Sequence, residues 1–411
     1  MSSSAAESTP AANAASGTDN APKVPFEEIE IRPFTRDDLV RLPRLLHDCL
    51  GRHSTPEWLE WRFFQGVWPD RLAFYVAEHH GELVAFIGAN PVPYSVDGEK
   101  SPVYQHQDTA IREDCRSLKL LRTLVDAAER RTPNPDEMLT YSITTPHMKA
   151  LVTKRMKYTV IWEDLKMVKP VSLRAYVSKA TKSAALTSLI PGPMSRSWKA
   201  PSSMTGDVRE IQTFGPEFDT FWAEANKPGE ESGGRIFAWQ DAEWLNYKYC
   251  NDAMVDFKRF AYYEGGRVLG YVILNITQLD VKVGYLDALW AVPGRTDVID
   301  LLVDFGIHEL VRNKTDKVDT WCRPETPLGK ALSQRGFQRR PTSQCFSIKQ
   351  LKKDMGDLGL KGEHWNIQRG NTYYTSVGHL SMEQGTQRLY QAKEAHDQKR
   401  SARLRGQGGE S

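Results

Sequence analysis

The sequence has no apolar run of about 18 residues, the length that a helix needs to cross a membrane, so no membrane span is expected. Its five cysteines are scattered and include no Cys-x-x-Cys pair, which argues against a disulfide framework and a zinc ribbon. An excess of one charge is also lacking, because 54 Lys and Arg residues face 52 Asp and Glu residues. Nucleic-acid binders usually carry a clear basic excess, so no DNA partner is expected. No metal motif, NTPase phosphate loop or serine-nucleophile elbow is present, and no metal is predicted.

The composition is typical of folded globular domains. The chain has 411 residues, of which 40% are hydrophobic and 26% charged, and roughly two or three domains fit this length. Residues 1–25 are rich in Ser, Ala and Thr and lack the basic and apolar segments of a secretory signal. We expect residues 1–25 and the polar residues 391–411 to be disordered. Together with the odd number and scattered positions of the cysteines, these features favour a cytoplasmic location.

An internal repeat divides the chain. Trp58–Phe64 (WLEWRFF) recurs as Trp244–Cys250 (WLNYKYC), and Phe74–Ile87 recurs as Phe260–Ile273, each at an offset of 186 residues (58 to 244, and 74 to 260). The longer pair has the pattern of two strands joined by a tight turn at His-Gly or Gly-Gly, which predicts a β-hairpin. This period is too long for a solenoid, so the repeat predicts a duplicated domain.

A basic linker separates the two copies. Residues 171–206 contain no acidic residue. Apolar residues from Leu173 to Ala184 recur at helical spacing, which predicts an amphipathic helix. The basic residues of this stretch are Arg174, Lys179, Lys182, Arg196 and Lys199. A basic amphipathic helix can lie on an anionic membrane surface, so a weak membrane contact is one expectation. Packing of the helix on its own domain is the alternative.

The start of the first copy has a recognisable pattern. Ile29–Phe34 predicts a strand, and the following Thr35-Arg-Asp-Asp38 predicts a helix start, with Thr35 as the N-cap and Asp38 at the capping-box position. This segment, with the strand, loop and helix pattern of Gln107–Arg130, resembles the GNAT acyltransferase superfamily. The Trp-x-x-Trp-Arg-Phe segment before the first hairpin resembles tandem acetyltransferase-like proteins found with bacterial exopolysaccharide biosynthesis.

The resemblance covers about residues 26–390. It implies an α/β (α+β) fold of two tandem GNAT-like lobes, each a mixed central sheet flanked by helices. The expected lobes are residues 26–170 and 207–390, joined by the linker 171–206.

The resemblance also implies a site for acetyl-CoA as co-substrate. In that family two strands splay, the pantetheine arm pairs with the fourth strand, and the pyrophosphate binds the N-terminus of the next helix. In this chain it assigns the cofactor to Ala110, Ile111, Arg116, Ser117, Leu118 and Lys119. Ser117 and Lys119 replace the usual glycines but supply a donor and a cation. In the second copy Asp297 stands at the matching helix start and would repel a pyrophosphate, so we expect CoA in the N-terminal lobe.

Acyl transfer also needs a base. His106 and Asp108 are two residues apart on the predicted fourth strand, which points them to one face, and a His–Asp pair would raise the imidazole pKa. His147 replaces an Asn common in the family. His79 and His80 are expected to be solvent-exposed rather than metal-binding, because adjacent strand residues point to opposite faces.

The Tyr that protonates the thiolate in many members of the family is missing. Thr153 stands at its place in the first copy, and Leu332 in the second.

The expected function is that of an acyl-CoA-dependent N-acyltransferase. It would acetylate a small-molecule amine, for example an amino sugar in polysaccharide biosynthesis. Two alternatives stay open. An aminoacyl-tRNA-dependent transferase of the peptidoglycan-bridge type would not need the glycine loop. A non-catalytic duplicated scaffold that binds a ligand or a partner protein would need neither the glycines nor the Tyr. The pattern does not determine the oligomeric state.

Overall fold

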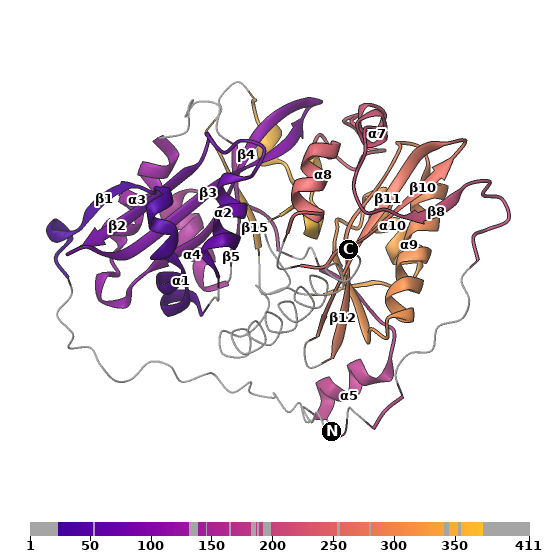
Figure 1. The fold of residues 1–411 in the computed structure, drawn as a ribbon, viewed down its shortest axis with the longest axis horizontal. Coiled ribbons are helices and arrows are strands. Elements are labelled where there is room, and N and C mark those ends of the chain that lie inside the picture. The colour runs from indigo at the N-terminus through magenta and orange to yellow at the C-terminus, as the bar shows by residue number, and fades with distance from the viewer. Residues whose placement is uncertain are drawn as a thin grey trace, which may run out of the picture.

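The computed structural model describes residues 24–51, 54–130, 139–144, 146–163, 166–181, 186, 189–191, 199–252, 255–278, 281–340, 345–351 and 355–372. These residues form two twisted sheets flanked by helices, one sheet in each of two lobes that lie side by side (Figure 1). The expected mixed α/β fold with two lobes is confirmed.

The first sheet is built mainly from the N-terminal copy. Its strand order is β1 (Glu30–Pro33), β2 (Ala73–His79), β3 (Glu82–Val96), β4 (Glu99–Ile111), β5 (Leu139–Thr144), β15 (Cys345–Gln350) and β6 (Thr159–Trp162). Off this path, β9 (Ile236–Ala238) pairs with β3 and β16 (Trp365–Asn366) pairs with β9. The helices of this lobe are α1 (Leu42–Leu50), α2 (Pro56–Phe64), α3 (Leu118–Arg130) and α4 (Pro146–Met156).

The second sheet repeats this order, as the sequence repeat predicts. Its strands run β8 (Asp207–Glu210), β10 (Lys258–Glu264), β11 (Arg267–Gln278), β12 (Lys282–Ala291), β13 (Lys317–Trp321), β7 (Lys166–Pro170) and β14 (Gln338–Arg339). The helices in this half are α5 (Leu173–Thr181), α7 (Glu217–Ala225), α8 (Ala242–Tyr249), α9 (Thr296–Arg312) and α10 (Pro327–Gln334).

Besides the short strands β9 and β16, each half of the chain places one strand inside the sheet of the other half. β7, the last strand of the N-terminal copy, pairs antiparallel with β13 and β14 of the second sheet. In return, β15 from the C-terminal copy lies between β5 and β6 of the first sheet and pairs with both. The expected boundary at residue 170 therefore divides the chain but not the sheets, and the lobes cannot separate without breaking these ladders.

The periodic apolar residues of the two long helices cover their sheets. In α3 the apolar positions Leu120, Leu121, Leu124, Val125 and Ala128 are buried against β2, β3 and β4. In α9 the matching positions Leu302, Val303, Gly306 and Leu310 are buried too, with Ile299 partly buried at the edge. This is the one-sided burial that a 3.6-residue period produces.

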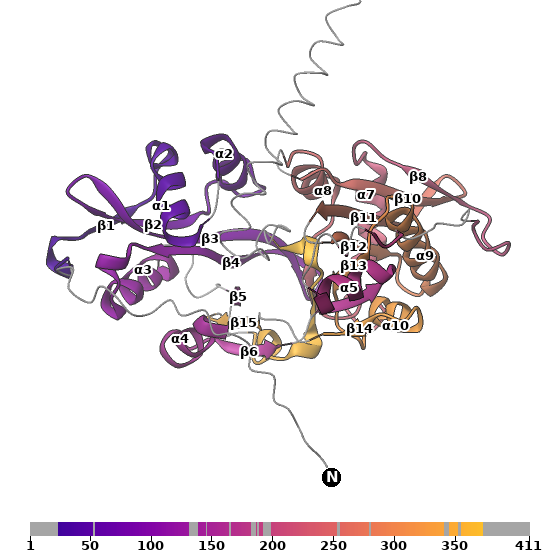
Figure 2. The same cartoon turned by 90° about the horizontal axis from the view of Figure 1, so that it is seen from below.

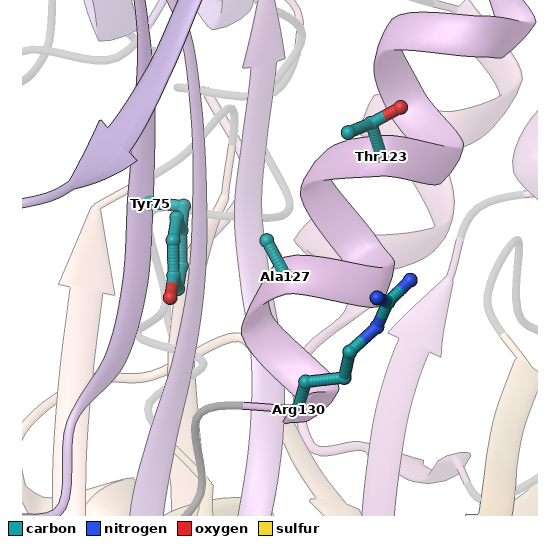
Figure 3. Close-up of a pocket in the computed structure, with 4 residues that line it drawn as sticks. All are labelled: Tyr75, Thr123, Ala127 and Arg130. Carbon is teal, nitrogen blue, oxygen red and sulfur yellow. The ribbon is translucent and has the colours of Figure 1, made fainter.

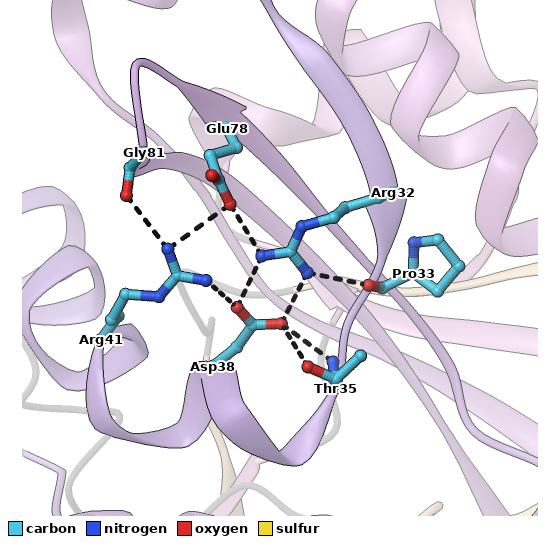
Figure 4. Close-up of polar contacts among 7 residues, drawn as sticks. All are labelled: Arg32, Pro33, Thr35, Asp38, Arg41, Glu78 and Gly81. Atoms are coloured by element: carbon cyan, nitrogen blue, oxygen red, sulfur yellow. Dashed lines mark hydrogen bonds and ion pairs between the residues drawn. The ribbon is translucent and has the colours of Figure 1, made fainter.

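A charged network fixes the first turn of the N-terminal lobe to its first hairpin (Figure 4). The Asp38 carboxylate accepts the Thr35 N–H at 2.9 Å, as the predicted capping box requires, and the turn that follows is a 3₁₀ helix over Arg36–Val40. Arg32 donates to Asp38 at 2.7 and 2.8 Å and to Glu78 of β2 at 2.8 Å. Burial opposes ionisation of Asp38, but the hydrogen bonds from Arg32 and Thr35 outweigh it and lower its pKa to about 2.

Candidate active site

The first sheet opens beyond the middle of β4. β4 pairs in parallel with β5 only from Val103 to His106, whereas β4 itself continues to Ile111. The ladder between β4 and β3 also shifts its register between Phe86 and Gly88, which leaves Asp108 in a β-bulge. Asp108 has a φ of +55°, the only positive φ of a non-glycine residue within a strand of the described chain. Such a backbone conformation costs roughly 1–3 kcal/mol and persists where the surroundings enforce it.

A buried ion pair holds this bulge. Arg62 of α2 contacts the Asp108 carboxylate at 2.6 Å, and their side chains are only 4% and 1% exposed. The same guanidinium donates to Gln107 and lies 4.9 Å from the centre of the Trp58 ring. The sequence analysis did not predict a role for Arg62. The repeat does carry a signal for it, since a cation, Lys248, stands at the same position of the second copy.

His106 does not pair with Asp108. Its ring is buried, packs edge-to-face on Tyr158 at 6.0 Å between ring centres, and neither ring nitrogen has a hydrogen-bond partner among the described residues. Burial, with a smaller effect of Lys349, lowers the pKa of His106 to about 4. The expected pair and its raised pKa are therefore wrong. The bulge interrupts the two-residue alternation of β4, and Asp108 contacts Arg62 instead.

The other residues expected in the transfer chemistry lie in α4 or in the second lobe. His147 is in the first turn of α4, and its side chain falls outside the described part of the structure. Thr153 donates its hydroxyl to the Lys149 carbonyl at 2.8 Å, and Leu332 is buried in the second lobe's core. Neither supplies an acid.

The residues expected to bind the cofactor do gather at one place. Ala110 and Ile111 end β4, and Arg116 to Lys119 are exposed at the start of α3. The Ser117 hydroxyl accepts the Leu120 N–H at 3.1 Å and so caps the helix. Lys119 contacts Glu27 at 3.0 Å and lies 4.0 Å from the centre of the Phe26 ring. A helix N-terminus with two nearby cations suits an anion.

The equivalent opening in the second lobe is occupied by the chain itself. β12 pairs with β13 only from Val283 to Tyr285 and bulges at Asp287. Beyond this point the Gln368 side chain takes the place of a neighbouring strand, because it accepts the Leu289 N–H at 2.7 Å and donates to the Leu289 carbonyl at 2.9 Å. The segment that carries Gln368, drawn in yellow, runs between the lobes beside β12 (Figure 2).

Three further contacts fix this segment, residues 362–372. Arg369 forms a buried ion pair with Asp287 and lies 3.7 Å from the centre of the Tyr285 ring. Arg323, just beyond β13, donates to the Trp365 carbonyl at 3.2 Å. A Cβ atom on Gly370 would come within 2.9 Å of the Asp287 carbonyl oxygen, so only glycine allows this approach.

The start of α9 is acidic, as expected. Asp297 lies in the first turn of α9, where Arg295 contacts it at 2.7 Å. Hydrogen bonding by Arg295 lowers the pKa of Asp297, with burial opposing the shift. The same Arg295 contacts Glu264 at 3.0 Å. Arg295 thus brings two carboxylates together beside the N-terminus of α9.

The two repeated helices meet between the lobes. The rings of Trp61 in α2 and Tyr247 in α8 stack with centres 5.2 Å apart, and the Tyr247 hydroxyl donates to the Arg62 carbonyl at 3.1 Å. Lys248 is buried next to this contact. Its desolvation lowers its pKa to about 8, although Asp252 opposes the shift. Perturbed groups of this kind are common near functional sites.

A separate shallow pocket lies between β2 and α3 (Figure 3). It is lined by Tyr75 of β2 and by Thr123, Ala127 and Arg130, which lie beyond the first turn of α3. None of the residues expected to bind acetyl-CoA lines it.

Comparisons with known proteins concern the N-terminal lobe and the fold. Residues 36–149 match the model of the acetyltransferase (GNAT) family, a stretch that holds every expected site residue. No curated protein sequence matches the chain. A structure of Saccharomyces cerevisiae N-myristoyltransferase with bound myristoyl-CoA is similar at a TM-score of 0.53 and 13% identity, covering 80% of this chain and 85% of that one. A second structure of that enzyme with myristoyl-CoA has a TM-score of 0.53 and 14% identity, with 80% of each chain covered. At these identities the likeness concerns the fold.

Proposed function

We propose that this protein is an acyl-CoA-dependent N-acyltransferase with its acyl-CoA site in the N-terminal lobe. The difference between the two openings carries the proposal. In the second lobe Gln368 satisfies the backbone of β12 at Leu289. At the equivalent Ala110 of β4, no side chain of the described residues does so, and a pantetheine amide can pair there.

Three side chains are proposed to hold the pyrophosphate. Arg116, Ser117 and Lys119 surround the first N–H groups of α3, which have no partner within a helix. Lys119 would exchange Glu27 for a phosphate oxygen. Since an exposed ion pair contributes about 0–1 kcal/mol, this exchange costs little. Acetyl-CoA is the proposed donor.

The residues proposed to serve the transfer chemistry are still His106, Asp108 and His147, but with changed roles. Asp108, paired with Arg62, acts as a positioning residue that fixes the β4 bulge. His106 is neutral at physiological pH, the form that accepts a proton, but its low pKa makes it a weak base. His147 is therefore the preferred base, and replacing it should reduce turnover more than replacing His106.

The acceptor is proposed to be an amine on a small molecule, for example an amino sugar of polysaccharide biosynthesis, bound between the lobes. α5 supports the weak membrane contact, because Leu173 and Tyr176 are 70% and 59% exposed beside basic residues. No helix in the described part of the chain is long and apolar enough to cross a membrane. The cytoplasm is the proposed location.

A non-catalytic scaffold is the second candidate. Its support is that Ser117 and Lys119 already bind groups of the protein and that neither Thr153 nor Leu332 is an acid. A scaffold of this kind would not cleave the thioester of acetyl-CoA in the presence of any amine.

Calorimetric titration with acetyl-CoA tests the proposal. The wild-type protein should bind one equivalent, and Arg116→Glu with Lys119→Glu should abolish binding by repelling the phosphates. Lys154→Glu with Arg155→Glu is the matched control, because it changes the charge equally on exposed residues of α4. Equal affinity in the α3 and α4 double variants would overturn the proposed site.

A further inference from the structure

The turn between β2 and β3 brings two imidazoles together. The turn residues His80 and Gly81 both have positive φ, +49° and +80°, which is the backbone of a two-residue hairpin turn of type I′. This backbone rotates the His80 side chain out of the alternation of β2. The rings of His79 and His80 consequently lie 4.0 Å apart, centre to centre, and not on opposite faces.

A carboxylate joins them from another part of the chain. Glu28 ends a 3₁₀ turn over Phe26–Glu28, and its Oε2 lies 3.2 Å from His79 Nε2. One possible ligand atom from each of Glu28, His79 and His80 lies within 4.8 Å of the other two. Two of the residues are exposed and His79 is partly buried, so the cluster is open to solvent.

We propose that Glu28, His79 and His80 form a zinc site. Zn²⁺ prefers imidazole nitrogens at about 2.0–2.1 Å and carboxylate oxygens at about 2.0–2.2 Å, in a tetrahedron whose corners are about 3.3 Å apart. The separation of Glu28 Oε2 and His79 Nε2 is 3.2 Å, close to this value. His80 becomes the third ligand by rotation of an exposed side chain, and a water completes the tetrahedron.

The ion would tie the chain's first described turn to the hairpin. That turn also supplies Phe26 and Glu27, which hold Lys119 at the start of α3. Without an ion, Glu28 and His79 form only a partly exposed pair at the surface, and such a pair contributes little to stability. Zinc should therefore raise the melting temperature through these three residues.

Titration of the full-length protein with zinc chloride, by calorimetry with a non-thiol reductant present, tests the site. The wild type should bind one equivalent. His79→Ala and His80→Ala should each lower the affinity at least about tenfold, since even residues behind metal ligands contribute about 10–100-fold. Glu28→Gln should lower it less, and zinc should no longer raise the melting temperature of the His79→Ala, His80→Ala double variant.

His47→Ala is the matched control. His47 Nδ1 lies 3.2 Å from Asp48 Oδ1, so it has the same kind of exposed acidic partner, but among the described residues it belongs to no cluster of three metal-ligating groups. This variant should bind zinc like the wild type. The proposal would be overturned if the His79→Ala, His80→Ala double variant bound zinc with full affinity. It would also be overturned if the wild-type protein, with a melting curve that chelator does not change, showed no saturable zinc binding.

Discussion

The two lobes share a strand order but differ at the point where each sheet opens. In the N-terminal lobe, β4 leaves β5 after His106, and Arg62 of α2 holds the bulge at Asp108. In the C-terminal lobe, β12 leaves β13 after Tyr285, and Arg369 from a late segment of the chain holds Asp287. The difference teaches that a shared strand order leaves both sheets open at the same point, and that in the C-terminal lobe the segment around Gln368 fills this opening.

The exchange of β7 and β15 gives the largest expected effect. Residues 1–206 and 207–411, expressed separately, should each fail to fold, because each sheet would lose an internal strand. Expressed together, the halves should assemble. Circular dichroism and size-exclusion chromatography measure both results. A half that folds alone as a monomer would show that the exchanged strand is dispensable for that lobe.

The two buried Arg–Asp pairs should respond alike in stability but differently in binding. Arg62→Met and Arg369→Met should each reduce the free energy of unfolding by about 3–5 kcal/mol, because each leaves a buried carboxylate without its guanidinium. Only Arg62→Met should weaken acetyl-CoA binding, since only that bulge lies at the proposed site. Denaturant titration and calorimetry measure the two quantities, and weaker binding in Arg369→Met alone would reverse the assignment of the lobes.

His106 should make the protein's stability depend on pH. Its folded-state pKa is about 4, below the usual value of about 6.5, so between these values the unfolded state binds more protons. The contribution of His106 to the free energy of unfolding is complete above pH 6.5. It falls by about 3 kcal/mol as the pH decreases towards 4.

His106→Leu should remove this part of the dependence, measured as the difference in unfolding free energy between pH 7 and pH 4.5. His47→Leu, at an exposed position, serves as the control. If His106→Leu showed the same difference in unfolding free energy between pH 7 and pH 4.5 as the wild type, burial of His106 would not be the source of this pH dependence.

The smallest effect concerns the closed opening itself. Gln368→Ala removes two hydrogen bonds to Leu289 and leaves that buried backbone without them, which should cost about 1–3 kcal/mol of stability. The variant should still bind one acetyl-CoA, because Asp297 remains in the first turn of α9 and Glu264 of β10 remains beside it through Arg295. Two bound equivalents in calorimetry would mean that Gln368 alone keeps the second lobe empty.

Much of this fold could be predicted because local patterns encode it. The hairpin turn at His80 and the capping box at Asp38 depend on neighbouring residues, and the structure contains both. The segments that repeat at an offset of 186 residues also form matching helices and hairpins in the two lobes. The exchange of β7 and β15 could not be read, because any strand with a suitable apolar face can pair with either sheet.

The site was predictable only in part, for a similar reason. The gathering of Arg116 to Lys119 at the start of α3 follows from chain order. The contact between Arg62 and Asp108 depends on a bulge, and one extra residue in a strand reverses the direction of its side chains. The occupation of the second opening by Gln368 joins residues 79 positions apart, with no periodic signal.

A crystal structure of the protein with bound acetyl-CoA tests the central claim most directly. We expect the pantetheine between β4 and β5, paired with the backbone at Ala110, and the pyrophosphate at Arg116 and Lys119, with Gln368 still bonded to Leu289. Acetyl-CoA between β12 and β13, with Gln368 displaced, would contradict the account.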